Sequence, residues 1–353
     1  MSYPYIEIIN IHKSYGSFEA LKGVSLEIER SSLVTLLGPS GCGKSTLLRC
    51  LAGLESVTDG QIVLDAQDIT GFSPRERNIG MVFQQYSLFP TMTVEKNVAF
   101  GLEVTHVSKE LIRKKVAEML EIVGLKDFAK RYPSQLSGGQ QQRAALARAL
   151  VTNPKVLLLD EPLSAIDAQL RKNLQSGIRR IQKERGITTI FVTHDQEEAM
   201  VMSDQIYLFN VGRIEQFGTP VEMYTHPTTK FAASFIGSYN IVDASFFSSR
   251  VPLPEGCENV AIRPEAVHIS SVPFDHTHSR VYMEGVITDS VPHGDIIRYT
   301  IDAGGLSLKG EMLFDEQIVL DNGQRVSLCI NTNDILPLRP EKDAKAAPAD
   351  PGQ

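Results

Sequence analysis

A glycine-rich stretch near the N-terminus holds the first residues whose types and spacing could do chemistry. It reads Gly38-Pro39-Ser40-Gly41-Cys42-Gly43-Lys44-Ser45-Thr46 and matches the pattern G-x-x-x-x-G-K-[ST]. Glycine permits backbone angles closed to other residues, so amide groups can approach phosphate oxygens. Lys44 supplies a positive charge to the β- and γ-phosphates, and the Ser45 hydroxyl is a ligand for Mg²⁺. By itself, the stretch predicts a phosphate-binding site.

Two adjacent carboxylates are predicted to serve the same phosphates. Asp160 and Glu161 stand at the end of the apolar run VLLLD at 156–160. Neighbouring residues of a strand point in opposite directions, so both are not expected to ligate one ion directly. We expect Asp160 to lie in the Mg²⁺ shell, through water, and Glu161 to polarise the attacking water.

A second glycine-rich motif, Leu136-Ser137-Gly138-Gly139-Gln140, precedes a predicted helix and has Ser137 at the cap position. The N-terminus of a helix attracts anions, and Ser137 can donate a hydrogen bond to a γ-phosphate. One phosphate loop already binds the nucleotide within its own subunit. The second motif therefore indicates a role across a dimer interface.

The elements that must position these groups alternate between strands and helices. Apolar runs predict strands at 33–37, 156–160 and 187–192, and helical spacing predicts helices at 44–52, 108–124, 139–151 and 167–185. This alternation predicts an α/β core, a mostly parallel sheet with helices on its faces. Residues of about 88–150 are expected to form an inserted helical subdomain.

The character of the chain changes near residue 240. Short β-rich runs at 260–263, 281–287, 296–301, 306–308 and 325–330 are separated by turn residues and predict a small all-β barrel or sandwich at 241–340. The tail at 341–353 is rich in Ala, Pro and charge and is expected to be disordered.

Composition narrows the class of protein. The chain of 353 residues has room for two domains, and its net charge of −7 gives no basic field for nucleic acid or anionic lipid. No apolar run is long enough to span a bilayer, and the N-terminus does not read as a signal peptide. Four scattered cysteines form no metal-ligand spacing, which favours a reducing cytosol.

Together GPSGCGKST, LSGGQQQR and VLLLDEP resemble the nucleotide-binding domain of ABC transporters, over about residues 5–240. The resemblance implies ATP and Mg²⁺ as ligands. It also implies that Tyr15 stacks on adenine, that Gln84 contacts Mg²⁺ and links to the membrane partner, and that His194 touches the γ-phosphate. Ser164 to Asp167 match the family's D-loop. Two departures are Ile166, where the family usually has Leu, and Ser31-Ser32, where a Gly-Glu pair often leads into the first core strand.

The region after FIGSYN (235–240), including Ala261 to Glu265, resembles the OB-like TOBE domain of importer ATPases for maltose, polyamine, ferric iron and phosphonate. FIGSYN lacks a Pro-x-Met insertion often seen in the sugar branch, which favours polyamine, ferric iron or phosphonate as the solute. OB-like domains can bind oligonucleotides, but 241–340 show no basic face interleaved with aromatic residues, so no nucleic-acid partner is expected.

The resemblance implies the partners as well. Two copies are expected to hold two ATP molecules head to tail and to drive two transmembrane permease subunits, supplied by a periplasmic solute-binding protein. A permease helix is expected to dock at Gln84 to Pro90. The protein is then expected at the cytoplasmic face of the inner membrane, as a peripheral subunit. The alternative is a P-loop or ABC ATPase that is not coupled to transport.

Overall fold

The computed structural model describes residues 3–83, 88–163, 168–275, 277, 279–315 and 319–340, with only the backbone for 168–170. The chain divides into two compact units, Met1–Pro220 and Val221–Gln353. The sequence analysis placed everything up to residue 240 in the nucleotide-binding domain, and that boundary stays a prediction. The expected disordered tail, 341–353, lies outside the described residues.

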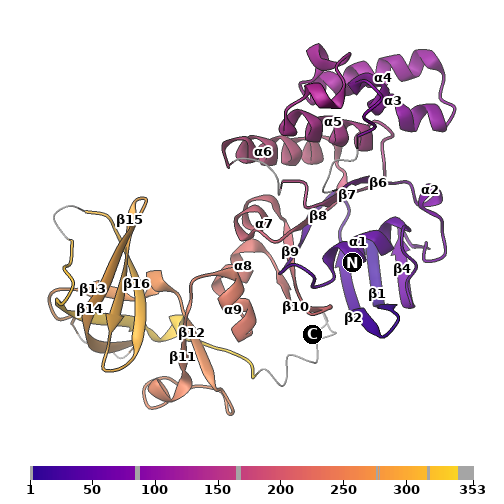
Figure 1. Cartoon of the computed structure of the whole chain (residues 1–353). Helices are drawn as coiled ribbons and strands as arrows, with labels where there is room; N and C mark the ends of the chain where they lie inside the picture. Colours follow the sequence, from indigo (N-terminus) through magenta and orange to yellow (C-terminus); the bar gives the residue numbers. More distant parts are fainter. Residues whose placement is uncertain are drawn as a thin grey trace. The chain divides into compact units, whose positions relative to one another are not determined.

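The first unit is built on a six-stranded sheet in the order β10-β9-β3-β8-β7-β6 (Figure 1). The pairs from β9 to β6 are parallel, and only β10 pairs antiparallel, with β9. This confirms the predicted α/β core, in which helices cover a mostly parallel sheet. The strands are β3 (Leu33–Leu37), β6 (Ile79–Val82), β7 (Val156–Asp160), β8 (Thr188–Thr193), β9 (Gln205–Asn210) and β10 (Arg213–Gly218). Every residue of β3, β7 and β8 is buried, as expected for central parallel strands, which read as apolar runs.

A second, antiparallel sheet has the order β2-β1-β4-β5. Its strands are β1 (Ile6–Tyr15), β2 (Phe18–Ile28), β4 (Asp59–Leu64) and β5 (Gln67–Asp68). The sequence analysis did not predict this sheet. It determines where the hairpin tip lies, with Tyr15 opposite Phe18 in the register of β1 and β2.

Helices fill the rest of the first unit. They are α1 (Lys44–Ala52), α2 (Pro74–Arg77), α3 (Val94–Val104), α4 (Lys109–Ile122), α5 (Gly138–Leu150), α6 (Ala168–Arg185) and α7 (Gln196–Met202). Ser108 caps α4, since its side chain accepts from the Leu111 amide, and Gly124 follows the helix with a φ of 66°. Both ends of this helix were predicted.

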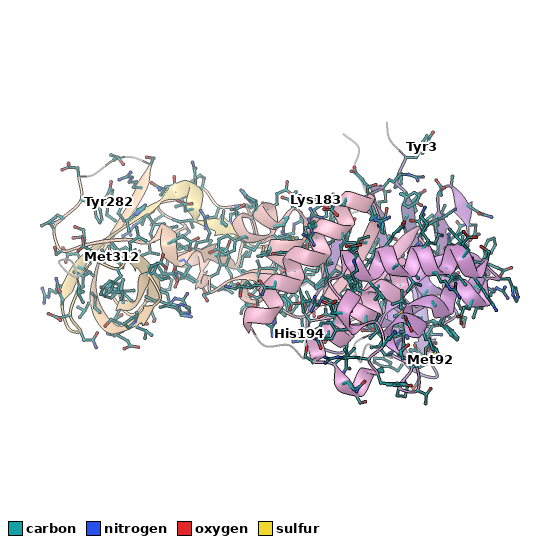
Figure 2. All side chains as sticks on the ribbon, turned by 90° about the horizontal axis from the view of Figure 1, so that it is seen from above. Tyr3, Met92, Lys183, His194, Tyr282 and Met312 are labelled. Carbon is teal, nitrogen blue, oxygen red and sulfur yellow. The ribbon has the colours of Figure 1, made fainter. Side chains whose placement is uncertain are left out.

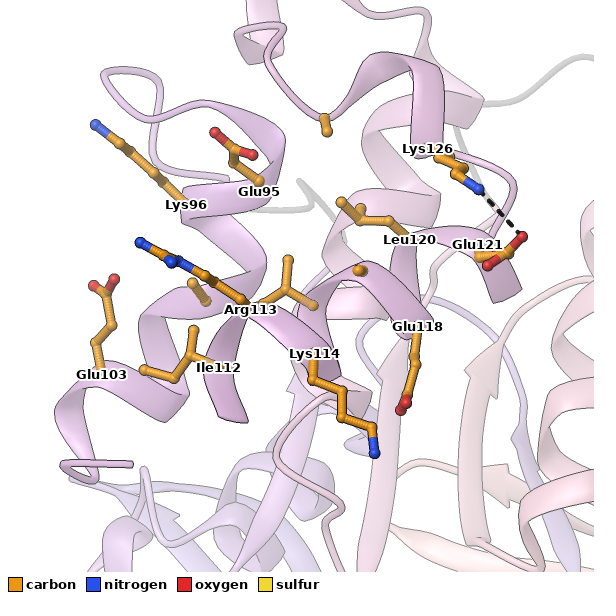
Figure 3. A pocket seen from close by; sticks show the side chains of 14 residues that line it. Glu95, Lys96, Glu103, Ile112, Arg113, Lys114, Glu118, Leu120, Glu121 and Lys126 are labelled. Carbon is orange, nitrogen blue, oxygen red and sulfur yellow. Dashed lines mark hydrogen bonds and ion pairs between the residues drawn. The ribbon is translucent and has the colours of Figure 1, made fainter. Parts of the chain in front are cut away.

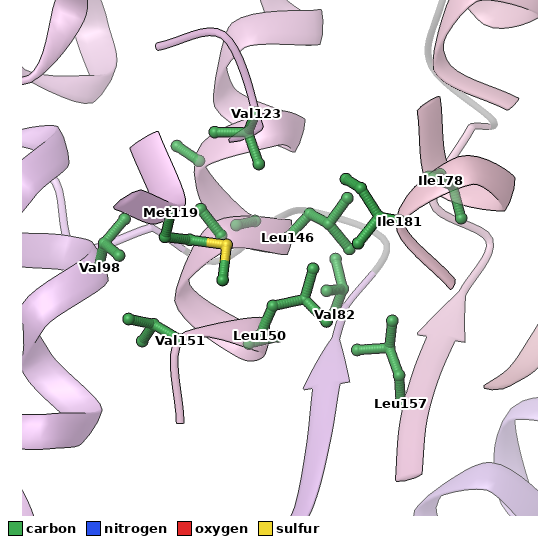
Figure 4. Close-up of a cluster of buried hydrophobic side chains, with 14 of the residues drawn as sticks. Val82, Val98, Met119, Val123, Leu146, Leu150, Val151, Leu157, Ile178 and Ile181 are labelled. Atoms are coloured by element: carbon green, nitrogen blue, oxygen red, sulfur yellow. The ribbon is translucent and has the colours of Figure 1, made fainter. Parts of the chain in front are cut away.

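One apolar core joins α5 to the sheet. Leu146 and Leu150 lie one turn apart on α5 and pack in one buried cluster with Val82 of β6, Leu157 of β7 and Ile181 of α6 (Figure 4). The helices α3 and α4 pack on α5 and bury Val98 and Met119 in the same cluster, together with Val116 and Leu120. The second glycine-rich motif, Leu136 to Gln140, lies at the start of α5 and is called the signature motif below. It is therefore carried by a helix that is anchored in the core.

The second unit holds two short helices, two antiparallel sheets and a core of its own. The sheets have the orders β11-β12-β18 and β13-β17-β14-β15-β16, which confirms an all-β C-terminal domain. The elements are α8 (Pro220–Thr225), α9 (Lys230–Ile236), β11 (Asn240–Asp243), β12 (Asn259–Ile262), β13 (His268–Ser270), β14 (Arg280–His293), β15 (Ile296–Asp302), β16 (Ser307–Leu313), β17 (Arg325–Asn331) and β18 (Leu336–Pro337). Tyr239 packs with Ala233 of α9, Ala261 of β12 and Leu338, so α9 belongs to this unit's core.

The hairpin turn between β9 and β10 has an unusual residue. Asn210 pairs with Arg213, which leaves Val211 and Gly212 as the two turn residues, and both have positive φ, 45° and 81°. Two left-handed residues define the turn type that suits a two-residue hairpin, and Asn-Gly is its favoured pair. The left-handed conformation costs about 1–2 kcal/mol for a residue with a Cβ, and a β-branched side chain adopts it rarely.

Candidate functional site

The phosphate loop connects β3 to α1, and its backbone requires glycine at the ends. Gly38 and Gly43 have φ values of 154° and 107°. A Cβ at Gly38 would lie 2.4 Å from the carbonyl oxygen of Phe209, and one at Gly43 would lie 2.8 Å from that of Ala20. The loop therefore fits closely against the neighbouring backbone, and the start of α1 follows it directly.

The side chain of Lys44 is buried against the phosphate loop. It is only 4% exposed, and Nζ donates to the carbonyl oxygens of Gly38 at 2.7 Å and Pro39 at 2.8 Å. Cys42 Sγ lies 3.7 Å from the same nitrogen. Burial raises the pKa of the Cys42 thiol, so Lys44 and not a thiolate provides the charge of the loop.

Ser45 and Asp160 meet across the loop. The Ser45 hydroxyl donates to Oδ1 of Asp160 at 2.7 Å, and Asp160 is buried. Burial raises the pKa of this carboxyl, and the hydrogen bond from Ser45 opposes the shift. A hydroxyl and a carboxylate are the oxygen ligands that Mg²⁺ takes, so these two residues fit the ion, with phosphate oxygens and water as its other ligands. Among the described residues no group of three or more His, Cys, Asp or Glu side chains could hold a metal by itself.

Glu161 points away from that pair and toward His194. Nδ1 of His194 lies 3.4 Å from Oε2 of Glu161. The two residues follow β7 and β8, which are neighbours in the sheet, and the Glu161 amide donates to Val192 of β8 at 3.1 Å. Glu161 has a φ of 44°, which turns the chain sharply as β7 ends. The expected divergence of the two acidic side chains is therefore seen in the geometry: Asp160 contacts Ser45, and Glu161 contacts His194 (Figure 2 labels His194).

The signature motif is a capped helix start. Gln140 Oε1 accepts from the Ser137 amide at 2.9 Å, and the Gln140 amide donates to Ser137 Oγ at 3.4 Å, so the two residues form a capping box. Gly138 differs from the glycines of the phosphate loop, because a Cβ at Gly138 would meet no atom within 4 Å and its φ is not positive. Nothing within its own subunit requires glycine at this position.

Tyr15 lies at the end of β1 and is 45% exposed. The ammonium of Lys13 lies 4.9 Å from the centre of its ring, and that ammonium is fixed by Glu55 at 3.2 Å and by the carbonyl oxygen of Ser56 at 2.6 Å. The buried ammonium of Lys13 thus makes a cation–π contact with the Tyr15 ring near the hairpin tip. Gln84 and the segment from Ser164 to Asp167, with Ile166, lie outside the described residues.

Two features of the site were not predicted. Glu198 is buried at the start of α7, accepts from the Thr193 hydroxyl at 2.6 Å and pairs with Arg171 at 3.7 Å, while burial raises the pKa of its carboxyl. These contacts hold the segment that carries His194. Gln142 of α5 is 2% exposed, and neither polar atom of its side-chain amide has a hydrogen-bond partner among the described residues. The acidic run after His194 was the available signal for Glu198, and nothing in the sequence indicated the state of Gln142.

Comparison with known proteins agrees with this geometry. Residues 21–164 match the ABC transporter family model, and residues 260–338 match the TOBE domain. The sulfate/thiosulfate import ATP-binding protein of Thermosynechococcus vestitus is 52% identical over 274 residues, which covers 78% of this chain and 81% of that protein. The spermidine/putrescine import ATP-binding protein of Aggregatibacter actinomycetemcomitans is 43% identical over 350 residues, covering 92% and 94%.

A solved structure gives the same result for the first unit. The ATP-binding cassette MJ0796, in a dimeric post-hydrolysis state bound to ADP and Pi, is 35% identical with a TM-score of 0.56, covering 61% of this chain and 98% of that one. The fold and the phosphate site thus define an ABC-type ATPase. More narrowly, the chain belongs to the ATP-binding subunits of ABC importers, in the form that carries a C-terminal TOBE domain. Within the described part of the chain, no helix is both long and apolar enough to cross a membrane.

Proposed function

We propose that two copies of this chain hydrolyse ATP at composite sites, each with the phosphate loop of one copy and the signature motif of the other. The observation that carries this is Gly138, which has open space where a side chain would be, at the start of a helix that attracts anions. A glycine that its own subunit does not require is explained by close approach of a nucleotide held elsewhere. A dimer also agrees with the solved relative, MJ0796, which is dimeric and bound to ADP and Pi.

The residues then divide the work. Lys44 and the loop amides of Gly38 to Thr46 bind the phosphates, and Tyr15 stacks on adenine. Ser45 and Asp160, with Gln84, hold Mg²⁺, which when bound neutralises phosphate charge. Glu161 accepts a proton from the attacking water, and His194, beside it at 3.4 Å, contacts the γ-phosphate.

The second copy completes the site. Ser137, Gly138, Gly139 and Gln140 of that copy approach the γ-phosphate from the opposite side, and Asp167 lies at the same interface. ATP thus holds the two copies together, and hydrolysis removes the contact that joins them.

We propose a second docking surface for a permease on the helical part of the first unit, apart from the segment Gln84 to Pro90 expected from the sequence. A cavity of ≈ 610 Å³ lies between α3 and α4 (Figure 3). Its floor includes Ile112 and Leu120, and charged side chains such as Glu103 and Arg113 surround it. An amphipathic helix of a membrane partner fits such a recess, with its apolar face on the floor. The docking segment expected from the sequence, Gln84 to Pro90, is described only from Leu88 onward.

For the solute we propose a small charged molecule, with polyamine, ferric iron and phosphonate as the candidates from the sequence. Polyamine is the one of these that a relative shares, since the protein from A. actinomycetemcomitans is named for spermidine and putrescine import. Other relatives are named for sulfate and thiosulfate, so both solutes belong in the test. We propose two permease subunits and a periplasmic binding protein as partners, and a location at the cytoplasmic face of the inner membrane.

Mixing two inactive variants tests the composite site. Glu161→Gln lacks the base, and Ser137→Arg fills the space of the γ-phosphate contact, so each homodimer should be nearly inactive. In a mixed dimer, the Ser137→Arg chain contributes an intact phosphate loop and Glu161, and the other chain contributes an intact signature motif. One complete site returns, so ATPase activity should exceed the sum of the two variants measured separately.

A mixture that gains nothing would contradict the composite site, with one check. If the two sites act only together, hybrids of wild type with Glu161→Gln would be inactive too, and that mixture is measured in parallel. Coupling to transport is tested separately, in vesicles that contain the permeases and the binding protein. An ATPase rate that responds to neither spermidine nor sulfate there favours the alternative, an ABC ATPase not coupled to import.

A further inference from the structure

A cavity of ≈ 180 Å³ lies beside the phosphate loop, on the side of β2 and of the β9–β10 turn. Phe18, Ala20, Ser40, Gly41 and Val211 are among the residues that line it. Two of these are large apolar side chains that remain in solvent, since Phe18 is 62% exposed and Val211 is 64% exposed. Exposed apolar side chains gathered at one hollow are typical of an interaction site.

Val211 adopts a backbone conformation that is strained for its residue type. It is the one β-branched residue with a positive φ in the part of the chain that the structure describes. The turn is tied down on both sides, because the Gly212 amide donates to Cys42 at 2.9 Å and its carbonyl oxygen accepts from Lys22 at 2.9 Å. Gly212 is required there, since a Cβ would lie 2.7 Å from the Ala20 carbonyl oxygen. No contact of that kind requires valine at 211, where asparagine would adopt the same conformation more readily.

The position of the cavity indicates what covers it. Ser40 and Gly41 belong to the phosphate loop and line the same hollow as Phe18 and Val211. In the proposed composite site, the second copy closes over this loop. The exposed apolar pair is therefore continuous with the surface that the second copy covers.

We propose that Phe18 and Val211 form an apolar contact with the second copy of the chain, which is made only when ATP closes the dimer. The inference rests on the proposed function, because it requires the head-to-tail dimer. It adds a contact that involves neither nucleotide nor signature motif. Strain at Val211 is then retained because the side chain is buried in the closed dimer and not in the separate subunit.

The test uses Val211→Asn and Phe18→Thr, each in the full chain that also carries Glu161→Gln, so that ATP-bound dimers accumulate. Asparagine should relieve the strain and raise the Tm of the nucleotide-free protein by about 3 °C. The same variant should weaken ATP-dependent dimerisation roughly tenfold, measured by sedimentation over a range of concentrations, because most of a valine side chain is no longer buried. Phe18→Thr replaces the exposed aromatic ring with a smaller side chain that still suits a strand, and it should weaken dimerisation without a rise in Tm.

Val272→Asn is the matched control. Val272 is 65% exposed and lies in the second unit, so its substitution should leave both the Tm and the dimer unchanged. The contact is supported if Val211→Asn raises the Tm and weakens dimerisation while Val272→Asn changes neither. If Val211→Asn and Phe18→Thr dimerise as the Glu161→Gln reference does, the contact is wrong while the composite site stands. A reference that fails to dimerise with ATP contradicts the proposed function, and the contact with it.

Discussion

Nδ1 of His194 lies 3.4 Å from Oε2 of Glu161, although the two residues directly follow different strands and a helix separates those strands in the chain. The pairing follows from the sheet, because β7 and β8 are parallel neighbours and their carboxyl ends meet at one edge. Ligands of open α/β sheets bind at that edge. Strand pairing thus positions both His194 and Glu161, the proposed base.

Glu161→Gln is expected to bind ATP and to remain in the closed dimer. The amide keeps the size of the side chain but does not accept a proton from water, so turnover should fall by about 10²–10⁴-fold. Light scattering with ATP measures the dimer, and phosphate release measures turnover. Near-normal turnover would exclude Glu161 as the base.

Lys44→Ala is expected to abolish ATP binding. The ammonium is the charge at the centre of the loop, and its two carbonyl contacts at 2.7 and 2.8 Å also help to hold the loop together. Titration calorimetry with Mg-ATP measures the affinity, and circular dichroism shows whether the variant is folded. An unchanged dissociation constant in the folded variant would exclude this loop as the phosphate site.

Asp160→Asn is expected to stabilise the nucleotide-free protein in a pH-dependent way. Burial raises the pKa of Asp160 above its ordinary value of 3.8, so the folded state binds the proton more tightly than the unfolded state. The wild type therefore loses stability as the pH rises from the unfolded pKa to the folded pKa, and asparagine does not. The Tm advantage of the variant should be absent at low pH and grow toward neutral pH.

Ser45→Ala is the contrast for that measurement. It removes the hydrogen bond that Asp160 accepts from Ser45 at 2.7 Å. Because the buried carboxylate then lacks this donor, the Tm of the variant at neutral pH should be lower than that of the wild type. Both variants should lose Mg-dependent ATP hydrolysis. A Tm difference between Asp160→Asn and wild type that does not change with pH would show that the Asp160 carboxyl has no raised pKa.

Deletion of 221–353 is expected to leave ATP affinity unchanged, because each described residue proposed to bind ATP lies in the first unit. Deletion of 241–353 should also retain binding, but it removes Ala261 and Leu338, which cover Ala233 and Tyr239. The longer fragment should therefore be cleaved faster by protease near α9. Loss of ATP affinity in a folded fragment ending at residue 220 would show that the second unit contributes to the nucleotide site.

The central strands and the phosphate loop could be predicted because each has a local signal. A buried parallel strand is a short apolar run, as at Leu33–Leu37, and the loop is a pattern of glycines with one lysine. The order of strands in the sheet has no local signal, so the contact of Glu161 with His194 was not predicted; the resemblance implied only that His194 touches the γ-phosphate. The antiparallel sheet of β1, β2 and β4 was missed because its strands are partly exposed and their apolar residues are less continuous. The positive φ of Val211 was missed for another reason. Valine rarely adopts this conformation, so its residue type does not predict the turn.

The hydrogen bond between Ser45 and Asp160 has a consequence for how the proposed magnesium site would select its ion. The Ser45 hydroxyl and the Asp160 carboxylate are hydrogen-bonded to each other. Two protein oxygen atoms alone supply too few of the six ligands that an octahedral ion takes. Free cations of the surrounding solution therefore gain little by entering. Magnesium bound to the phosphates of a nucleotide would bring its other oxygen ligands with it, so we expect this pair of residues to favour the Mg-ATP complex over the free ion.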